Sequence, residues 1–299
     1  MRIVRYIKLL RPQQWTKNLF IFAALLFAGQ LLNSGFLLKS LIAFIAFCGI
    51  SSTVYIINDI VDIEADRIHK KKRFRPLASG EVTVKQAIIF LIPVFIISVF
   101  LTITLHYYFW ITAGLYIIIN TAYTFKVKDI VLLDVFFISF GFILRVAGGA
   151  AAISVPISSW MILTTIFISL FLAVSKRRAE LSLTESENIP KQRKVLDQYD
   201  IVLTDQMNTI ASTGTIICYA LYTVSPRTVE HFRTENLIYT TPFVIYGIFR
   251  YLYLIHKKNL GESPSSTLIK DIPLIINTFL WLIISVIIIY KQRIINLLF

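Results

Sequence analysis

Four polar side chains follow one another at helical spacing where a long apolar stretch ends: Asn58, Asp59, Asp62 and Asp66. On an α-helix these side chains fall within an arc of about 100°, whereas Glu64 points away from them. Carboxylates gathered on one face at a membrane boundary repel one another and require a cation. Such oxygen ligands suit Mg²⁺, which is completed by water and substrate phosphates. The spacing therefore predicts a magnesium site at these four residues, with Asp59 and Asp62 also assigned to catalysis.

A basic run follows the acidic segment directly and supplies the opposite charge. Lys72, Arg73 and Arg75 are the members that we expect to hold substrate phosphates. The alternative is a solvated helix end with a positively charged anchor beside it. That alternative explains the lysines but not the polar residues on one helical face.

The elements that must position these residues are membrane helices. Hydrophobic residues make up 56% of the 299 residues and charged residues only 16%, with a mean hydropathy of +0.71. Apolar stretches long enough to cross a bilayer core recur along the chain. We therefore predict one all-α polytopic domain over 1–299, in which about nine helices surround a polar cavity that faces the cytoplasm. The predicted spans are 18–34, 36–57, 84–105, 108–125, 131–152, 159–175, 209–225, 238–255 and 272–290.

The charges are strongly one-sided under this topology. With a cytoplasmic N-terminus, 23 of the 30 Lys and Arg residues fall on the cytoplasmic side and five on the other. This division predicts a multi-pass protein of the inner or plasma membrane with its N-terminus and active site in the cytoplasm. The net charge of +13 is thus a sidedness signal, and no soluble basic domain is present to bind nucleic acid.

Three cytoplasmic segments frame the predicted site. Residues 1–17 read as an interfacial amphipathic helix, interrupted at Pro12. Segments 66–83 and 176–208 read as polar cap loops. Cys48 and Cys218 fall inside apolar spans and are expected to behave as small apolar residues.

Several motifs in chain order resemble one protein family. They are N-D-x-x-D-x-x-x-D at 58–66, R-P-Q-Q-W-T-K-N at 11–18, K-R-F-R-P-L-A-S-G at 72–80, L-D-V at 133–135 with G-F-I-L-R at 141–145, and K-R-R-A-E-L at 176–181. The first motif with nine spans resembles the UbiA superfamily of intramembrane prenyltransferases. Where most members carry a second aspartate-rich motif, this chain has Lys176-Arg177-Arg178. With the other motifs, this departure resembles the decaprenyl-phosphate phosphoribosyltransferase branch.

The resemblance implies a UbiA-like helical bundle and a Mg²⁺-dependent reaction. In this reaction 5-phosphoribosyl 1-diphosphate (PRPP) donates its phosphoribosyl group to a polyprenyl phosphate, and pyrophosphate leaves. A second aspartate motif would repel the phosphate of the lipid, whereas Lys176, Arg177 and Arg178 would attract it. The expected partners are PRPP, polyprenyl phosphate and membrane lipids, and a homo-oligomer is compatible with the sequence.

Further residues are expected to bind these substrates. Lys17 is a phosphate ligand by the resemblance, Tyr55 lies one turn before Asn58, and Lys126 begins the loop after the fourth predicted span. Arg145 lies about 20 Å into its span, where a charge is costly and usually functional. We expect it to take part in catalysis and substrate binding, with Asp134 as a partner on nearly the same face.

Two other functions remain open from the sequence. One is prenyl transfer from a prenyl diphosphate to an aromatic or lipid acceptor, which the missing second aspartate motif disfavours. The other is transport of a polyanion, for which Arg145 would line a path. The charges gather at one face of the membrane instead of at its middle, which favours an enzyme.

The one-sided charges make the topology testable. Cysteines introduced at Ser79 and Ser186 should react with a membrane-impermeant thiol reagent only after the cells are opened, because both cap loops face the cytoplasm. Labelling of either cysteine in intact cells would contradict the predicted orientation.

Overall fold

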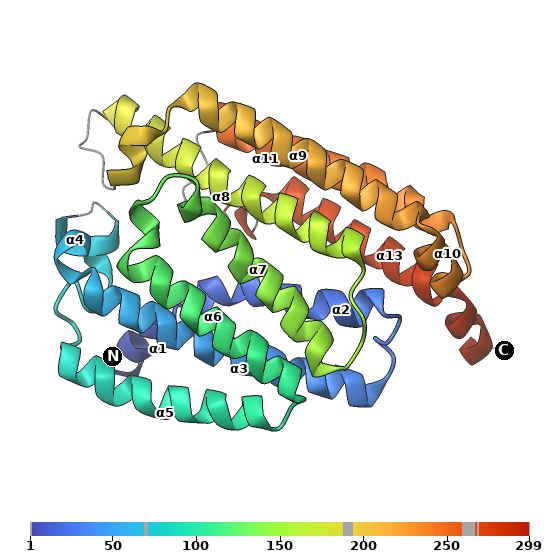
Figure 1. The fold of residues 1–299 in the computed structure, drawn as a ribbon, viewed down its shortest axis with the longest axis horizontal. Helices are drawn as coiled ribbons and strands as arrows, with labels where there is room; N and C mark the ends of the chain where they lie inside the picture. The colour runs from blue at the N-terminus through green and yellow to red at the C-terminus, as the bar shows by residue number, and fades with distance from the viewer. Residues whose placement is uncertain (1, 69–70, 188–193, 259–266, 268, 299) are drawn as a thin grey trace. The chain divides into compact units, whose positions relative to one another are not determined.

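The chain consists of helices joined by short connections. The computed structural model describes residues 2–68, 71–187, 194–258, 267 and 269–298, and in these residues the secondary structure is helical, as predicted (Figure 1). The chain divides into two compact units, Met1–Leu25 with Asn33–Val155 (unit 1) and Leu26–Leu32 with Pro156–Phe299 (unit 2). The single membrane domain over 1–299 stays a prediction.

Unit 1 is built around one long helix. Helix α3 (Ser34–Val61) packs against its neighbours α5, α6 and α7 in this unit (Figure 1). The other elements of this part of the chain are α1 (Arg2–Leu10), η1 (Pro12–Ile21), α4 (Ile63–Ile68), η2 (Lys72–Phe74), α5 (Val84–Ile103), α6 (Tyr107–Phe125), η3 (Val127–Asp129) and α7 (Leu133–Ala152). Helix α2 (Phe22–Phe27) lies where the chain passes from unit 1 to unit 2.

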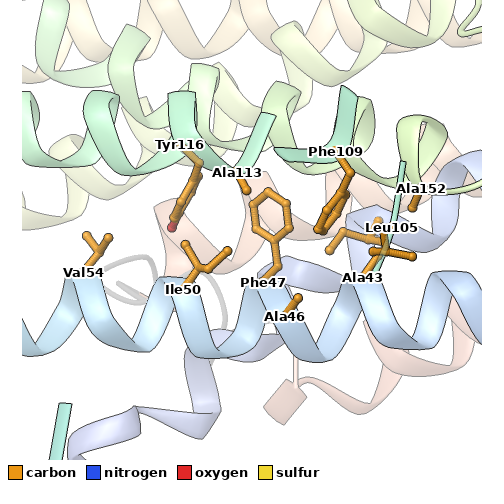
Figure 2. Packing of buried hydrophobic residues seen from close by; sticks show 11 residues of the cluster. Ala43, Ala46, Phe47, Ile50, Val54, Leu105, Phe109, Ala113, Tyr116 and Ala152 are labelled. Carbon is orange, nitrogen blue, oxygen red and sulfur yellow. The ribbon is translucent and has the colours of Figure 1, made fainter. Parts of the chain in front are cut away.

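Helices α3 and α5 start at residues suited to capping. The helices of unit 1 pack through a shared aromatic core. The Asn33 side chain accepts hydrogen bonds from the first amides of α3, and Thr83 with Gln86 forms a capping box at the start of α5. In the core, the ring of Phe47 makes edge-to-face contacts with Phe109 at 5.6 Å and Tyr116 at 5.3 Å between centroids (Figure 2). This core holds the polar end of α3 in place.

Unit 2 is a second helical assembly with its own core. Its elements are α8 (Ser159–Glu187), η4 (Lys194–Gln198), α9 (Ile201–Val224), α10 (Pro226–Phe232), η5 (Asn236–Thr240), α11 (Thr241–Lys258) and α13 (Ile272–Leu298). Helix α8 packs along α9, and Phe171 contacts the ring of Tyr251 in the core. Arg250 on α11 donates to both carboxylate oxygens of Asp271, just before α13, at 3.0 and 2.8 Å.

Six helices in the described part of the chain are long and apolar enough to cross a membrane. They cover the predicted spans at 36–57, 84–105, 131–152, 159–175, 238–255 and 272–290. Helices α6 and α9 coincide with two further predicted spans but are not among these six. Nine crossings therefore stay a prediction.

The first predicted span differs most from the structure. Residues 18–34 do not form one helix, because the 3₁₀ segment η1 is followed by the six-residue helix α2 and a turn at Gly29. The cause is local, since Pro12 sets the start of η1 and Asn18 is buried. The side-chain nitrogen Nδ2 of Asn18 donates to Cys48 Sγ at 3.2 Å and to Ser51 Oγ at 3.3 Å.

Cys48 and Cys218 are buried free thiols, in keeping with the sequence analysis.

Segment η1 passes unusually close to α7, and this contact gives a stability prediction. A Cβ atom at Gly149 would lie 2.0 Å from the carbonyl oxygen of Ile21. Gly149→Ala should therefore destabilise the protein by at least about 1 kcal/mol. Gly114→Ala is the matched control, because a Cβ there meets nothing within 4 Å. It should be neutral or stabilising by up to about 1 kcal/mol.

Thermal unfolding of the purified variants in detergent provides the measurement. Equal melting temperatures for the two alanine variants would contradict the close approach of η1 and α7.

Candidate functional site

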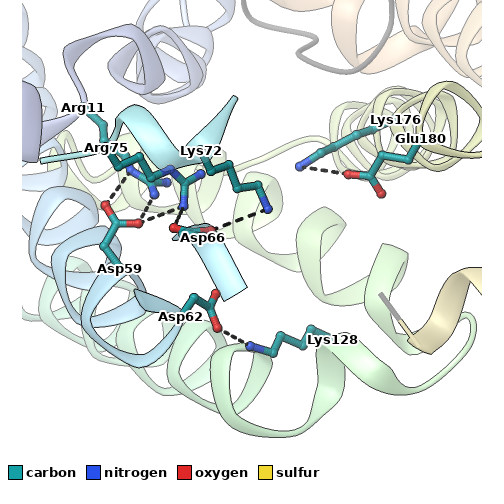
Figure 3. A network of polar contacts seen from close by, with 9 residues as sticks. All are labelled: Arg11, Asp59, Asp62, Asp66, Lys72, Arg75, Lys128, Lys176 and Glu180. Atoms are coloured by element: carbon teal, nitrogen blue, oxygen red, sulfur yellow. Dashed lines mark hydrogen bonds and ion pairs between the residues drawn. The ribbon is translucent and has the colours of Figure 1, made fainter. Parts of the chain in front are cut away.

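Two of the predicted acidic residues converge on one arginine. Asp59, near the end of α3, and Asp66, in α4, both accept hydrogen bonds from Arg75 Nη1, at 3.0 Å and 2.5 Å (Figure 3). Lys72 Nζ lies 4.0 Å from the other oxygen of Asp66. Only 3% of the Asp59 side chain and 4% of the Asp66 side chain is exposed. The acidic segment and the basic loop after it thus form one ion-pair network in unit 1.

Arg11 also belongs to this network, and the sequence analysis assigned it no role. Its Nε donates to Asp59 Oδ2 at 3.2 Å, and its Nη2 donates to Oδ1. The guanidinium also lies over the ring of Tyr55, 5.2 Å from the centroid. Arg11 adopts a left-handed backbone with φ of 52°, between α1 and η1. The one hint in the sequence is that Arg11 directly precedes Pro12, because a helix must end there and the side chain then leaves the helical face.

Asp62 does not join Asp59 and Asp66, contrary to the single arc expected from helical spacing. Helix α3 ends at Val61, and Asp62 has a ψ of 12°, so the chain turns before α4 begins. Asp62 instead accepts a hydrogen bond from Lys128 Nζ at 2.7 Å (Figure 3). Glu64 lies apart from both groups, with 82% of its side chain exposed, and pairs with Arg67.

The remaining predicted residues of the acidic region have different surroundings. Lys126, which was assigned to substrate phosphate, is exposed at the end of α6, and Lys128 two residues later contacts Asp62. Arg73 is exposed and lies over the ring of Phe74. The backbone carbonyl of Asn58 accepts from the amide of Asp62. Lys17 lies partly buried in η1.

The surroundings of Arg75 lower the pKa of its guanidinium. Loss of solvent and the positive charge of Arg11 lower this pKa, and the carboxylates of Asp59 and Asp66 offset only part of the effect. The carboxylates provide the hard oxygen donors that Mg²⁺ prefers, and Asp59 with Asp66 already faces a shared positive charge. These residues therefore fit the ion chemically. Among the described residues, however, no group of three or more His, Cys, Asp and Glu side chains is arranged to hold a metal.

Arg145 is buried in unit 1, and its described hydrogen bonds go to uncharged groups. It donates from Nε to Asn18 Oδ1 at 2.7 Å, from Nη1 to the carbonyl of Gly141 at 2.7 Å and from Nη2 to the hydroxyl of Tyr116 at 2.9 Å. The Tyr116 ring also lies 4.7 Å below the guanidinium. The expected pairing with Asp134 is thus replaced by contacts that connect α7 with η1 and α6.

The three cations of the 176–178 motif, on α8 of unit 2, have unequal surroundings. The side chain of Arg177 is 0% exposed, and its Nη1 donates to Glu180 at 2.5 Å. Lys176 is 33% exposed, and its Nζ lies 3.9 Å from the other oxygen of Glu180. Arg178 donates to Asp205 on α9 at 2.5 Å, and His256 Nε2 lies 3.2 Å from the same oxygen. Asp205 and His256 could not be recognised as partners of the motif from the sequence, because they lie on other helices, α9 and α11.

The burial of Arg177 predicts that it stabilises the fold. Arg177→Gln removes a charged hydrogen bond from a largely buried carboxylate and should lower the unfolding free energy by about 1.5–3 kcal/mol. Lys176→Gln is the matched control, and it should cost about 1 kcal/mol or less, because that pair is longer and more exposed. Chemical unfolding of the two variants in detergent measures the difference. A larger loss for Lys176→Gln would show that Arg177 does not hold Glu180.

Comparison with known proteins identifies the family of this chain. Residues 18–283 match the UbiA prenyltransferase family. A decaprenyl-phosphate phosphoribosyltransferase of Mycolicibacterium smegmatis is 35% identical, with 92% of this chain and 89% of the relative covered. The protein of that name from Mycobacterium tuberculosis (strain H37Rv) is 34% identical over 72% of each chain. A UbiA homologue from Archaeoglobus fulgidus, solved bound to GPP and Mg²⁺, has the same fold. It aligns with a TM-score of 0.72 at 18% identity, covering 95% of this chain and 99% of that one. The chain therefore belongs to the UbiA prenyltransferase family.

Proposed function

We propose that this protein transfers the 5-phosphoribosyl group of PRPP to a polyprenyl phosphate, releasing pyrophosphate and forming a polyprenylphosphoryl-5-phosphoribose. The observation that carries the proposal is the 35% identity over 92% of the chain to a decaprenyl-phosphate phosphoribosyltransferase. The charges of the described residues support it. Among the described residues of unit 1, Arg11, Lys72, Arg75 and Lys128 lie beside the carboxylates of Asp59, Asp62 and Asp66 and could contact substrate phosphates.

The acidic and basic residues of unit 1 suit the donor substrate. Asp59, Asp62 and Asp66, with the amide of Asn58, would hold a Mg²⁺ ion, which when bound neutralises the leaving pyrophosphate. Arg75 and Lys72 would bind phosphate oxygens, because guanidinium and ammonium groups form charge-assisted hydrogen bonds with them. We assign the same role to Lys17, Arg73 and Lys126, and contact with a phosphate or the ribose to Tyr55.

The reaction itself requires charge stabilisation more than proton transfer. The bond between C1 of the ribose and the pyrophosphate oxygen breaks, and the electron pair leaves with that oxygen. A phosphate oxygen of the lipid then forms the new bond to C1, which develops positive character. Because the acceptor is already an anion, no side chain has to remove a proton. The cations of the site lower the barrier by stabilising the charge that builds up on pyrophosphate.

The cations of unit 2 suit the phosphate of the acceptor lipid. Lys176 is the partly exposed member of the 176–178 motif, so we assign the direct contact to its ammonium group. Arg177 and Arg178 are more buried and bonded to Glu180 and Asp205. They act by orienting α8 and its neighbouring charges. Arg145, with its hydrogen bonds to Asn18 and Tyr116, likewise acts by positioning η1.

A polyprenyl phosphate presents its head group at the membrane surface, and PRPP is a soluble polyanion. We therefore place the site at the cytoplasmic face of a multi-pass protein in the cell membrane, in agreement with the one-sided basic charges.

The proposal is tested by supplying purified protein and Mg²⁺ with radiolabelled PRPP and polyprenyl phosphate. A labelled lipid product is expected. Under the same conditions, a prenyl diphosphate with 4-hydroxybenzoate should give no product. Product from the second pair alone would show that the enzyme transfers prenyl groups.

Two variants connect this activity to the acidic segment. Asp62→Ala should reduce activity by about a hundredfold or more, because it removes a metal or phosphate-positioning contact and leaves Lys128 unpaired. Glu64→Ala is the matched control on an exposed carboxylate and should retain activity. Equal loss in the two variants would contradict the assignment of Asp62.

A further inference from the structure

Two of the three carboxylates that would bind a metal, Asp59 and Asp66, are bonded to arginine side chains. Arg75 Nη1 lies between Asp59 and Asp66, and Arg11 contacts both oxygens of Asp59 (Figure 3). The carboxylates are almost fully buried, while 25% of the Arg75 side chain and 19% of the Arg11 side chain is exposed. The arginine side chains are therefore more accessible to solvent than the carboxylates they bond.

We infer that Arg75 and Arg11 occupy the cation position of this site in the ligand-free protein and exchange partners when substrate binds. The inference rests on the proposed function. In the exchange, the two guanidinium groups leave Asp59 and Asp66 and bind phosphates of PRPP, and the carboxylates then face the divalent ion that accompanies PRPP. Each buried charge keeps an opposite charge beside it before and after the exchange, which avoids the large cost of an unpaired buried carboxylate.

The backbone of Arg75 is fixed by hydrogen bonds, so the exchange that we infer is a movement of its side chain. The amide of Arg75 donates to the carbonyl of Lys72 at 2.9 Å, and its carbonyl accepts from the amide of Ser79 at 2.8 Å. The backbone of Arg75 is therefore held on both sides, while 25% of its long side chain is exposed to solvent.

The exchange makes metal and PRPP binding mutually dependent. When a divalent ion binds alone, it has to displace Arg75 from Asp59 and Asp66, and the guanidinium of Arg75 is then left without an anionic partner. PRPP alone has to separate the arginines from their carboxylates without replacing the lost positive charge. Each ligand removes the obstacle to the other, so each should raise the affinity for the other by the same factor.

This inference predicts a gain of metal binding from the loss of a cation. Arg75→Gln removes the guanidinium from Asp66 and one of the two guanidinium groups from Asp59, so the purified full-length variant should bind Mn²⁺ alone at least about tenfold more tightly than the unmodified protein. The measurement is titration with Mn²⁺, whose free fraction is read from its electron paramagnetic resonance signal. The same variant should bind PRPP in the presence of Mg²⁺ about ten- to a hundredfold more weakly, because a phosphate contact is lost.

Three further variants separate this effect from a general change in charge or folding. Arg67→Gln removes the same charge from an exposed pair with Glu64 and should leave Mn²⁺ affinity unchanged. Arg11→Gln removes one of the two guanidinium groups bonded to Asp59 and should also tighten Mn²⁺ binding, which tests the idea independently if Arg75→Gln does not fold. Adding Asp66→Asn to Arg75→Gln should abolish the gain.

The outcomes distinguish this inference from the proposed function. Unchanged Mn²⁺ affinity in both the Arg75→Gln and Arg11→Gln proteins would overturn the exchange, and so would an equal gain in Arg67→Gln. If the Mn²⁺ gains appear but no form of the protein binds PRPP, the arginines do occupy a cation position and the proposed substrate is wrong.

Discussion

The arrangement of unit 1 depends on the need of buried carboxylates for a positive partner. A carboxylate that loses water near a membrane boundary is strongly unfavourable unless a cation and hydrogen bonds replace the water. Asp59 and Asp66 satisfy this requirement through Arg75, which returns from the loop after α4. Asp59 also accepts a hydrogen bond from Arg11, which directly precedes η1. The same pairing thus positions the N-terminal segment, the end of α3 and the basic loop.

The same constraint explains differences among residues that look alike in sequence. In the 176–178 motif, Arg177 is buried with Glu180 as its partner, and Arg178 is paired with Asp205. Lys176 keeps part of its surface exposed. Arg145 shows a second way to bury a cation, since Asn18, Gly141 and Tyr116 surround it with oxygen acceptors and an aromatic ring. A positive charge held in this way rigidifies the contact between α7 and η1.

Local sequence patterns predicted the helical class, most helix positions and the acidic segment with its basic loop. They did so because apolar length and helical spacing are properties of one continuous stretch. The failures involve contacts between distant segments. Asp62 does not share the expected arc because the chain turns there, and its partner Lys128 lies 66 residues later in the sequence. Arg11 was missed because its partner Asp59 lies 48 residues away. The helix expected at 18–34 is replaced at its start by η1, in which the buried side chain of Asn18 accepts a hydrogen bond from Arg145.

If guanidinium groups hold the place of the metal until PRPP arrives, binding of PRPP and Mg²⁺ must separate Arg75 from Asp66. The measurement is the distance between Arg75 Nη1 and Asp66 Oδ2 in a structure determined with both ligands bound. That distance is 2.5 Å in the ligand-free protein. We expect it to exceed hydrogen-bonding range in the complex, with Arg75 bonded to a phosphate and the two carboxylates facing the metal. An intact pair between Arg75 and Asp66 beside bound PRPP would contradict the account.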